Sequence, residues 1–204
     1  MADQNHSRIV REQWQTLAPR MLETAKAIWS KPELPNMEYY AAGLLSQWLK
    51  EEGFDVEERV CGIPTAFRAK FRQGNGPRIG LLAEYDALPG TDNDAVSHRK
   101  PLGQAAGHAC GHNYIGAANV AAAIAAKRAL EYFKTQGEIV LLGCPSEEIT
   151  WGKVVMLDRG GFDNLDVILT SHADDRNAVA SQPCMSVFGA EFVFTGQTSH
   201  GGSP

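Results

Sequence analysis

The feature that most constrains the fold is a long alanine-rich segment that leads into a short apolar run. Residues 113–134 carry alanine and leucine at a density that favours a helix, which Gly137 would close. Residues 138–143 then have the pattern of a strand that is buried on both faces of a sheet. Helices and strands that alternate in this way predict an α/β fold, with a mostly parallel sheet sandwiched by helices.

Further segments continue this alternation along the chain. Apolar residues recur at helical spacing from about residue 7 to residue 30, and Pro32 and Pro35 then break the helix. A second helix is expected over residues 37–52. The remaining expected elements are a helix over residues 153–158 and strands over residues 55–61, 65–71, 78–83 and 166–170. The first two of these strands are expected to form a hairpin.

The chain changes character after Asp174. Residues 185–195 are rich in strand-forming side chains, and a loop over residues 197–204 follows them at once. A lone strand and loop cannot form a core. We therefore expect residues 1–176 to belong to one domain. Residues 177–204 would open a second module, incomplete here and beginning with that strand.

Composition argues against several classes of partner. The 204 residues are 44% hydrophobic and 21% charged, carry a net charge of -5 and contain no Lys/Arg cluster, so a nucleic-acid partner is not expected. Residues 1–11 do not read as a secretory signal, and the weakly polar run over residues 114–126 is too short to span a bilayer. Four cysteines without framework spacing fit a reduced compartment. We expect a cytoplasmic protein without a membrane partner.

A glycine-flanked run crowds two imidazoles and a thiol together just before the alanine-rich helix. Its sequence is GHACGHN, residues 107–113, in which Cys110 and His112 stand two residues apart. Such a pair either binds metal or is structural, and the run alone does not decide between the two. His108 either supports its neighbours or is a loop residue.

Other polar side chains follow the expected strands. Asp86, the adjacent Glu147 and Glu148, and His172 each come shortly after an apolar strand. In an open, mostly parallel sheet, active sites form outside the carboxyl ends of the strands, and the N-terminus of the helix after Cys110 can face the same crevice. The candidate ligands are then a thiolate, two imidazoles and a carboxylate, which could bind one or two divalent ions such as zinc.

The glutamate pair suggests hydrolytic chemistry. Along an extended chain Glu147 and Glu148 would point to opposite sides, so one could bind metal while the other faces a substrate. A carboxylate beside a metal-activated water can take its proton and deliver it to the leaving amine of an amide. Simpler explanations exist for each residue: the pair could open a helix, Asp86 could cap a turn, and His172 could be an ordinary strand-end histidine.

Five short motifs follow one another along nearly the whole chain. They are LLAEYDALP at residues 81–89, GHACGHN at 107–113, CPSEE at 144–148, GFD at 161–163 with His172, and SHGGSP at 199–204. In this order they resemble the zinc-dependent aminoacylase and carboxypeptidase family. More narrowly, they are similar to the amidohydrolase branch that includes aminobenzoyl-glutamate hydrolases and indole-acetyl-amino-acid hydrolases.

The resemblance implies a di-zinc exopeptidase-like fold with an inserted lid and dimerisation domain. It also implies a two-metal hydrolase that cleaves the amide bond of an N-acyl amino acid or small peptide. Carried over position by position, Cys110 would bridge two metal ions, with His112, Glu148 and His172 as further ligands. Glu147 would be the general base. The ions would be zinc, with manganese or cobalt as alternatives.

Further roles are implied by the same resemblance. Asp86 would orient a ligand, and His200 is similar to a lid histidine that reaches across a homodimer to the substrate in the partner's active site. In the peptidase branches a histidine stands in place of Glu84 and an aspartate in place of Cys110, whereas the amidohydrolase branch uses a Cys and His pair as this chain does.

The chain also departs from the family pattern. Asn113 stands where part of the branch has an aspartate, and Ile149-Thr150-Trp151 stands where small glycines usually follow the glutamate pair, which bears on substrate preference. The family's catalytic domain is completed after the lid by a segment with one last histidine ligand, which this sequence lacks. We therefore expect the N-terminal portion of an amidohydrolase, inactive by itself.

Two other hypotheses remain at this point. The first is a non-catalytic truncated relative that acts as a dimerising or regulatory subunit. The second is a purely structural zinc site. It is disfavoured by Glu147, because structural zinc sites are closed and have no use for an adjacent base.

Overall fold

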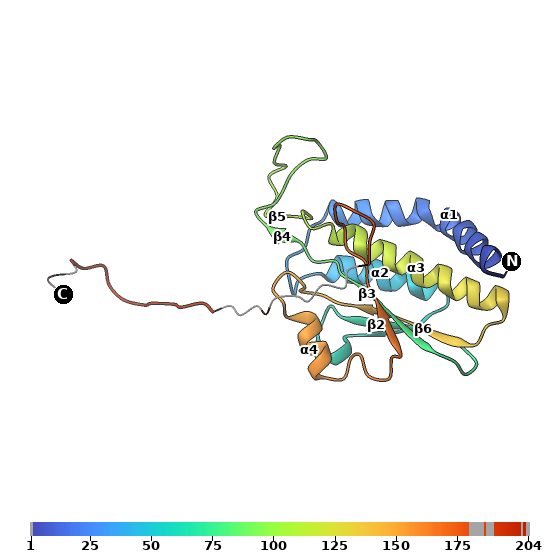
Figure 1. The fold of residues 1–204 in the computed structure, drawn as a ribbon. Helices are drawn as coiled ribbons and strands as arrows, with labels where there is room; N and C mark the ends of the chain where they lie inside the picture. Colours follow the sequence, from blue (N-terminus) through green and yellow to red (C-terminus); the bar gives the residue numbers. More distant parts are fainter. Residues whose placement is uncertain (1, 180–185, 187–189, 201, 203–204) are drawn as a thin grey trace.

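The centre of the fold is a five-stranded sheet with the strand order β1-β2-β6-β3-β7 (Figure 1). A computed structural model describes residues 2–179, 186, 190–200 and 202. The strands of the sheet are β1 (Asp55–Glu58), β2 (Phe67–Gln73), β3 (Arg78–Ala83), β6 (Gly137–Gly143) and β7 (Val167–Leu169). β3 is parallel to β6 and β7, whereas β2 is antiparallel to β6 and to β1. The predicted hairpin is therefore formed by β1 and β2, and the parallel part of the sheet is the part that carries the candidate site.

Helices cover both faces of this sheet, as the sequence predicted. Three of them lie on one face and α4 lies on the other (Figure 1). Their bounds are α1 (Ala2–Trp29), α2 (Tyr39–Glu51), α3 (His112–Phe133) and α4 (Gly152–Asp158). A 3-10 turn, η1 (Val60–Gly62), joins β1 to β2, and a small two-stranded sheet is formed by β4 (Leu88–Pro89) and β5 (Ala106–Gly107).

The core is divided between the two faces because side chains alternate along each strand. Leu81 of β3 and Leu141 of β6 pack with the three-helix layer, whereas Leu82 and Leu142 pack on the other side with Met156 of α4. All seven residues of β6 are buried. A strand that is covered on both faces has no polar side to show, which is why residues 139–142 of β6 read as one apolar run, and the buried Glu138 before them is paired with Arg78.

The last strand of the sheet differs from the expectation. The sequence predicted a buried strand over residues 166–170, but Val167, Ile168 and Leu169 are 48%, 43% and 51% exposed. β7 pairs with β3 on one side, and within the described residues no strand pairs with its other side. An apolar composition therefore predicted the strand correctly and its burial wrongly.

The segment that follows β7 has little regular structure in its described part. Residues 190–199 are not in a strand, and Phe192 and Phe194 are 79% and 92% exposed. The predicted strand over residues 185–195 is absent there, because a strand needs a paired neighbour; its residues 185 and 187–189 lie outside the described residues. The domain boundary near residue 176 stays a prediction. No helix of the described residues has the length and apolar character needed to cross a membrane.

Candidate metal centre

The predicted site residues meet at the edge of the sheet where the parallel strands end. Asp86 lies just beyond β3, Glu147 and Glu148 lie beyond β6, and His172 lies beyond β7. His112 is the first residue of α3, whose N-terminus faces the same edge. The sequence argument from strand ends therefore placed these side chains correctly relative to one another.

A buried pair forms the inner part of the centre. His112 is fully buried and Asp86 is 1% exposed, and the His112 Nδ1 atom lies 2.9 Å from the Asp86 Oδ1 atom. The other Asp86 oxygen accepts a hydrogen bond from the backbone N–H of Glu148 at 3.0 Å. Asp86 thus fixes both the imidazole and the turn after β6. The His112 Nε2 atom remains buried without a hydrogen-bond partner among the described residues.

Two groups of donor atoms share this histidine. One group is Cys110, His112 and His172, and the other is His112, Glu147 and Glu148; in each, the donor atoms lie within 4.8 Å of one another. Two ligands of one zinc ion, each about 2.0 to 2.3 Å from it, lie roughly 3 to 4 Å apart. Either group is therefore compact enough to close on an ion after small side-chain movements, and His112 would serve one ion only, because its Nδ1 atom is bonded to Asp86.

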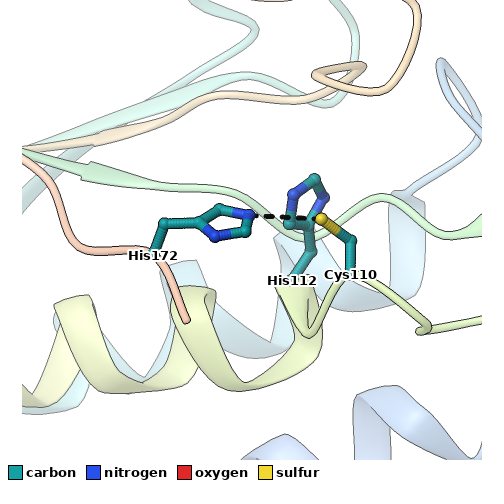
Figure 2. A group of neighbouring side chains, drawn as sticks. All are labelled: Cys110, His112 and His172. Atoms are coloured by element: carbon teal, nitrogen blue, oxygen red, sulfur yellow. Dashed lines mark hydrogen bonds between the residues drawn. The ribbon is translucent and has the colours of Figure 1, made fainter. Parts of the chain in front are cut away.

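The outer part of the centre is formed by a thiol and an imidazole. Figure 2 shows the Cys110 thiol pointing toward the His172 ring, with His112 beside it, and the Sγ and Nε2 atoms of the first pair are 3.2 Å apart. The His172 Nδ1 atom lies 2.8 Å from the Ala173 carbonyl oxygen, to which its N–H can donate. That bond leaves the Nε2 atom unprotonated, so its lone pair can bind a metal. Gly111, with a φ of 80°, lets the chain turn between Cys110 and α3.

Negative charge is concentrated at this edge. Burial and the neighbouring Glu148 and Glu147 carboxylates raise the pKa of the Cys110 thiol to about 11. Burial also raises the pKa of Glu148 above its ordinary range, although His112 opposes this. For His112 burial works against the charged form, but the Asp86 carboxylate outweighs it and raises the pKa. A site that holds a thiol and several carboxylates in this way favours a cation, which would convert the thiol to a thiolate.

Known proteins resemble this chain in sequence and in fold. A family model for peptidase family M20/M25/M40 matches residues 80–191, more than half of the chain. This chain belongs to that family. It is 38% identical to a subunit of the p-aminobenzoyl-glutamate hydrolase of Escherichia coli, over 89% of this chain and 38% of that protein. It is 36% identical to the Xaa-Arg dipeptidase of Mus musculus, over 90% of this chain and 41% of that protein.

The M20 chain thus spans less than half of the length of these relatives. Among solved structures it resembles a dinuclear metal-binding peptidase of the M20 family from Bacillus subtilis, with a TM-score of 0.64 and 22% identity. That match covers 78% of this chain and 44% of the other. At this identity the likeness establishes a shared fold.

The two glutamates of the M20 chain differ in exposure. The Glu148 side chain is 15% exposed and the Glu147 side chain is 34% exposed, and each has an oxygen 3.8 Å from a ring nitrogen of His112. Both belong to the same donor group. Glu147 as base and Glu148 as ligand therefore stay predictions, which the greater exposure of Glu147 favours because a base must reach a water molecule.

Sequence reasoning missed a lysine at this centre. Lys153, the second residue of α4, donates a hydrogen bond to Glu84, and its Nζ atom lies 3.8 Å from the Glu147 Oε1 atom. Glu84 is 6% exposed, and its other oxygen lies 3.5 Å from the His112 Nε2 atom. The lysine reaches the centre only because the turn after β6 folds back, and no spacing rule in the sequence announces that turn.

The remaining predicted residues lie outside the two donor groups. His200 is exposed and accepts a hydrogen bond from the Gly202 backbone N–H at 3.2 Å, so its lid role stays a prediction. Burial lowers the pKa of His108 to about 4, and its ring nitrogens have no described partner. Asn113 donates to the Ala25 carbonyl oxygen at 3.1 Å and thereby ties α3 to α1.

Proposed function

We propose that this chain forms part of the catalytic domain of a metal-dependent amidohydrolase. Its substrate would be an N-acyl amino acid or a dipeptide-like compound. The observation that carries this proposal is the pair of donor groups that share His112, with Glu147 beside them. The names of the two relatives above, a hydrolase of an acyl glutamate and a dipeptidase, support the same substrate class.

The residues present fit two divalent ions. The buried His112 Nε2 and Glu148 Oε1 atoms have no hydrogen-bond partner in the described part of the chain, so a cation could bind them, and Cys110 and His172 add ligands suited to zinc. The name of the Bacillus subtilis neighbour as a dinuclear metal-binding peptidase supports the count of two. Zinc is our first choice, with manganese or cobalt as alternatives.

The mechanism assigns the protein side chains distinct tasks. When bound, the ions would polarise the amide carbonyl and lower the pKa of the attacking water from 15.7 toward about 7. Glu147 takes a proton from that water and passes it to the leaving amine, which must be protonated as the C–N bond breaks. Asp86 holds His112 in the tautomer that presents its Nε2 atom to the centre.

We also propose that the whole protein acts as a homodimer through a lid, with His200 contributing to the partner's active site, and that it works in the cytoplasm. The Escherichia coli relative is named as one subunit of a hydrolase, which is consistent with assembly with another chain. The same name also supports a second candidate, a non-catalytic dimerising or regulatory subunit.

Metal content and turnover separate the two candidates. The complete protein that carries this chain would be loaded with zinc, manganese or cobalt and assayed on p-aminobenzoyl-glutamate, Xaa-Arg dipeptides and N-acetyl amino acids. We expect about two ions per chain and release of the amine that stops on addition of a chelator. A complete protein that binds metal but hydrolyses none of these amides would favour the regulatory subunit. Residues 1–204 alone are expected to be inactive.

A further inference from the structure

The connection between α1 and α2 lies far from the metal centre in sequence but contacts two of its loops. The Glu33 carbonyl oxygen accepts a hydrogen bond at 2.8 Å from the backbone N–H of Ala87, which follows Asp86. Glu38 accepts one at 2.8 Å from the backbone N–H of Ser146, which precedes Glu147. One short segment therefore supports the turn after β3 and the turn after β6.

The turn after β6 has an unfavourable backbone conformation where it leads into Glu147. Ser146 is fully buried and has a φ of 58°, in the left-handed region that costs a residue with a side chain free energy. A Cβ atom on Gly152 would lie 1.8 Å from the Pro145 carbonyl oxygen, so the turn is also closed too tightly for another residue there. Such a conformation persists only when its surroundings hold it.

Glu38 contributes two hydrogen bonds to that hold, beside the one that the Ser146 hydroxyl accepts from the Asn36 N–H at 2.8 Å. The Glu38 side chain is completely buried, and its Oε1 atom accepts hydrogen bonds from the Ser146 N–H at 2.8 Å, the Ser146 hydroxyl at 3.2 Å and the Asn36 N–H at 2.9 Å. Its Oε2 atom accepts one from the Thr65 hydroxyl at 2.9 Å. Burying a carboxylate is costly, so this one is expected to have a task.

That task is not the capping of α2. Glu38 is the residue that precedes the helix, but its side chain makes no capping hydrogen bond. The first turn of α2 is capped by Glu33, whose two carboxylate oxygens accept hydrogen bonds from the backbone N–H groups of Tyr40 and Ala41, each at 2.9 Å. The bonds of Glu38 go to the loops around Ser146 and Thr65 instead.

We propose that Glu38 is a positioning residue for the glutamate pair, because it holds Ser146 in the left-handed conformation that directs the chain into Glu147 and Glu148. The backbone is then anchored on both sides of Glu147. Ser146 is held by Glu38, and the Glu148 N–H is held by Asp86. Between two fixed peptide groups the Glu147 side chain keeps its direction toward the centre. The expected effect of Glu38 on catalysis rests on the proposed function. Its expected effect on the turn around Ser146 rests on the hydrogen bonds alone.

The kinetic test compares variants of the complete, metal-loaded protein. Glu38→Asp keeps the charge but is one methylene too short to reach Ser146 and Thr65 together. We expect kcat for an N-acyl amino acid to fall about 10- to 100-fold with little change in KM, because misplacement of a catalytic group by about 1 Å costs this much. Glu38→Gln can keep an oxygen toward Ser146 and an N–H toward the Thr65 hydroxyl, so its kcat should stay near the wild-type value.

A second substitution makes the test specific. In the Glu38→Asp background, Ser146→Gly should recover at least about half of the lost kcat on a logarithmic scale, because glycine adopts a positive φ without the steric cost. Glu138→Leu is the matched control: it removes another carboxylate, 6% exposed and paired with Arg78 at the far end of β6, and should leave kcat unchanged. A Glu38→Asp protein with unchanged kcat, or one that Ser146→Gly does not improve, would overturn the proposal.

Hydrogen exchange provides a test that needs no turnover. In metal-free protein, Glu38→Asp should speed amide exchange at least about tenfold in a peptide covering residues 144–150, whereas Glu138→Leu should not. Equal exchange in the wild type and Glu38→Asp would overturn the role of Glu38 even in an active enzyme. A wild-type protein without metal-dependent turnover but with this local exchange change would contradict the proposed function and leave the Glu38 anchor supported.

Discussion

The inner and outer halves of the metal centre are held in different ways. In the inner half, Asp86, His112 and Glu148 are tied together by hydrogen bonds, and the first two are at most 1% exposed. In the outer half, Cys110 contacts an exposed His172 that follows the exposed strand β7. The described chain therefore builds the inner half by its own packing, whereas the outer half lies where the sheet edge is open.

This difference has an energetic meaning. A buried polar group whose partner is removed loses its hydrogen bond and keeps the cost of desolvation, whereas water replaces the partner of an exposed group. Substitutions in the inner half should thus disturb both folding and metal binding. Substitutions in the outer half should disturb metal binding alone.

The largest expected effect concerns Glu147, whose carboxylate lies 3.8 Å from the His112 Nε2 atom. In the complete enzyme Glu147→Gln should lower kcat by about 10² to 10⁴-fold, the usual cost of losing a general base, while the two metal ions remain bound. Kinetics and elemental analysis of the same preparation would measure both quantities. Glu148→Gln is the matched control, because it changes the more buried neighbour and should lose metal.

The opposite result would exchange the two roles. If Glu147→Gln lost metal while Glu148→Gln kept it and lost turnover, Glu147 would be the ligand and would belong with the inner half. Both side chains lie 3.8 Å from the same imidazole, so the two variants change carboxylates at equal distances from His112.

The second effect tests the comparison directly through stability. Asp86→Ala should lower the free energy of unfolding of the metal-free protein by about 3 kcal/mol, because it leaves His112 and the Glu148 N–H buried without their partner. His172→Ala should change it by less than about 0.5 kcal/mol, as expected at an exposed position. Urea unfolding of both variants measures the difference. Equal losses would show that the outer half is as firmly built as the inner one.

The parts of this site that follow from the order of the strands could be predicted from the sequence, whereas contacts that depend on side-chain packing could not. The strand ends brought Asp86, Glu147 and His172 together correctly, because a parallel sheet places the ends of its strands on one edge. Lys153 and Glu38 were missed because they reach the site through side-chain packing between distant segments. A buried polar contact of this kind depends on the exact turn between them, and residue type alone carries no signal of it.

The fold shows the same division. β6 was predicted with its burial because the apolar run over residues 139–142 requires cover on both faces, and α3 supplies one of them. β7 has the same composition, yet it lies at the edge and is exposed. Composition reports what a strand can bury, whereas its position in the sheet decides what it does bury.

A smaller effect is the pH dependence of the metal-free protein. Burial opposes the charged forms of His112 and Asp86, but their contact outweighs it. The pKa of His112 is raised above 6.5 by Asp86, and the pKa of Asp86 is lowered below 3.8 by His112 and the Glu148 N–H. A raised histidine pKa gives stability that is present below 6.5 and lost as pH rises through the folded value. A lowered aspartate pKa gives stability that is present above 3.8 and lost as pH falls through the folded value.

The charged pair of His112 and Asp86 should therefore stabilise the metal-free protein between about pH 3.8 and pH 6.5. This stabilisation should decline as the pH rises further and His112 loses its proton. Melting temperatures from pH 4 to pH 9 would show it, and Asp86→Asn should remove the dependence. Added zinc should reverse the alkaline decline, because a metal-bound imidazole is neutral and binding improves as protons leave. A melting temperature that keeps rising above pH 7 without metal would contradict the inner pair.

The smallest expected effect concerns thiol reactivity and tests whether the outer half is open. Burial raises the pKa of Cys144 to about 12 and, with the neighbouring carboxylates, that of the partly exposed Cys110 to about 11. Only the thiolate reacts with iodoacetamide, so at pH 8 roughly one Cys110 in a thousand is reactive at any moment. We expect slow labelling of Cys110 in metal-free protein and none of Cys144, which is fully buried. Peptide mass spectrometry distinguishes the two.

Zinc should protect Cys110 by occupying its sulfur, and a chelator should restore the labelling. If zinc left the rate unchanged, the thiol would not be a ligand, and the metal would be held by the inner half alone.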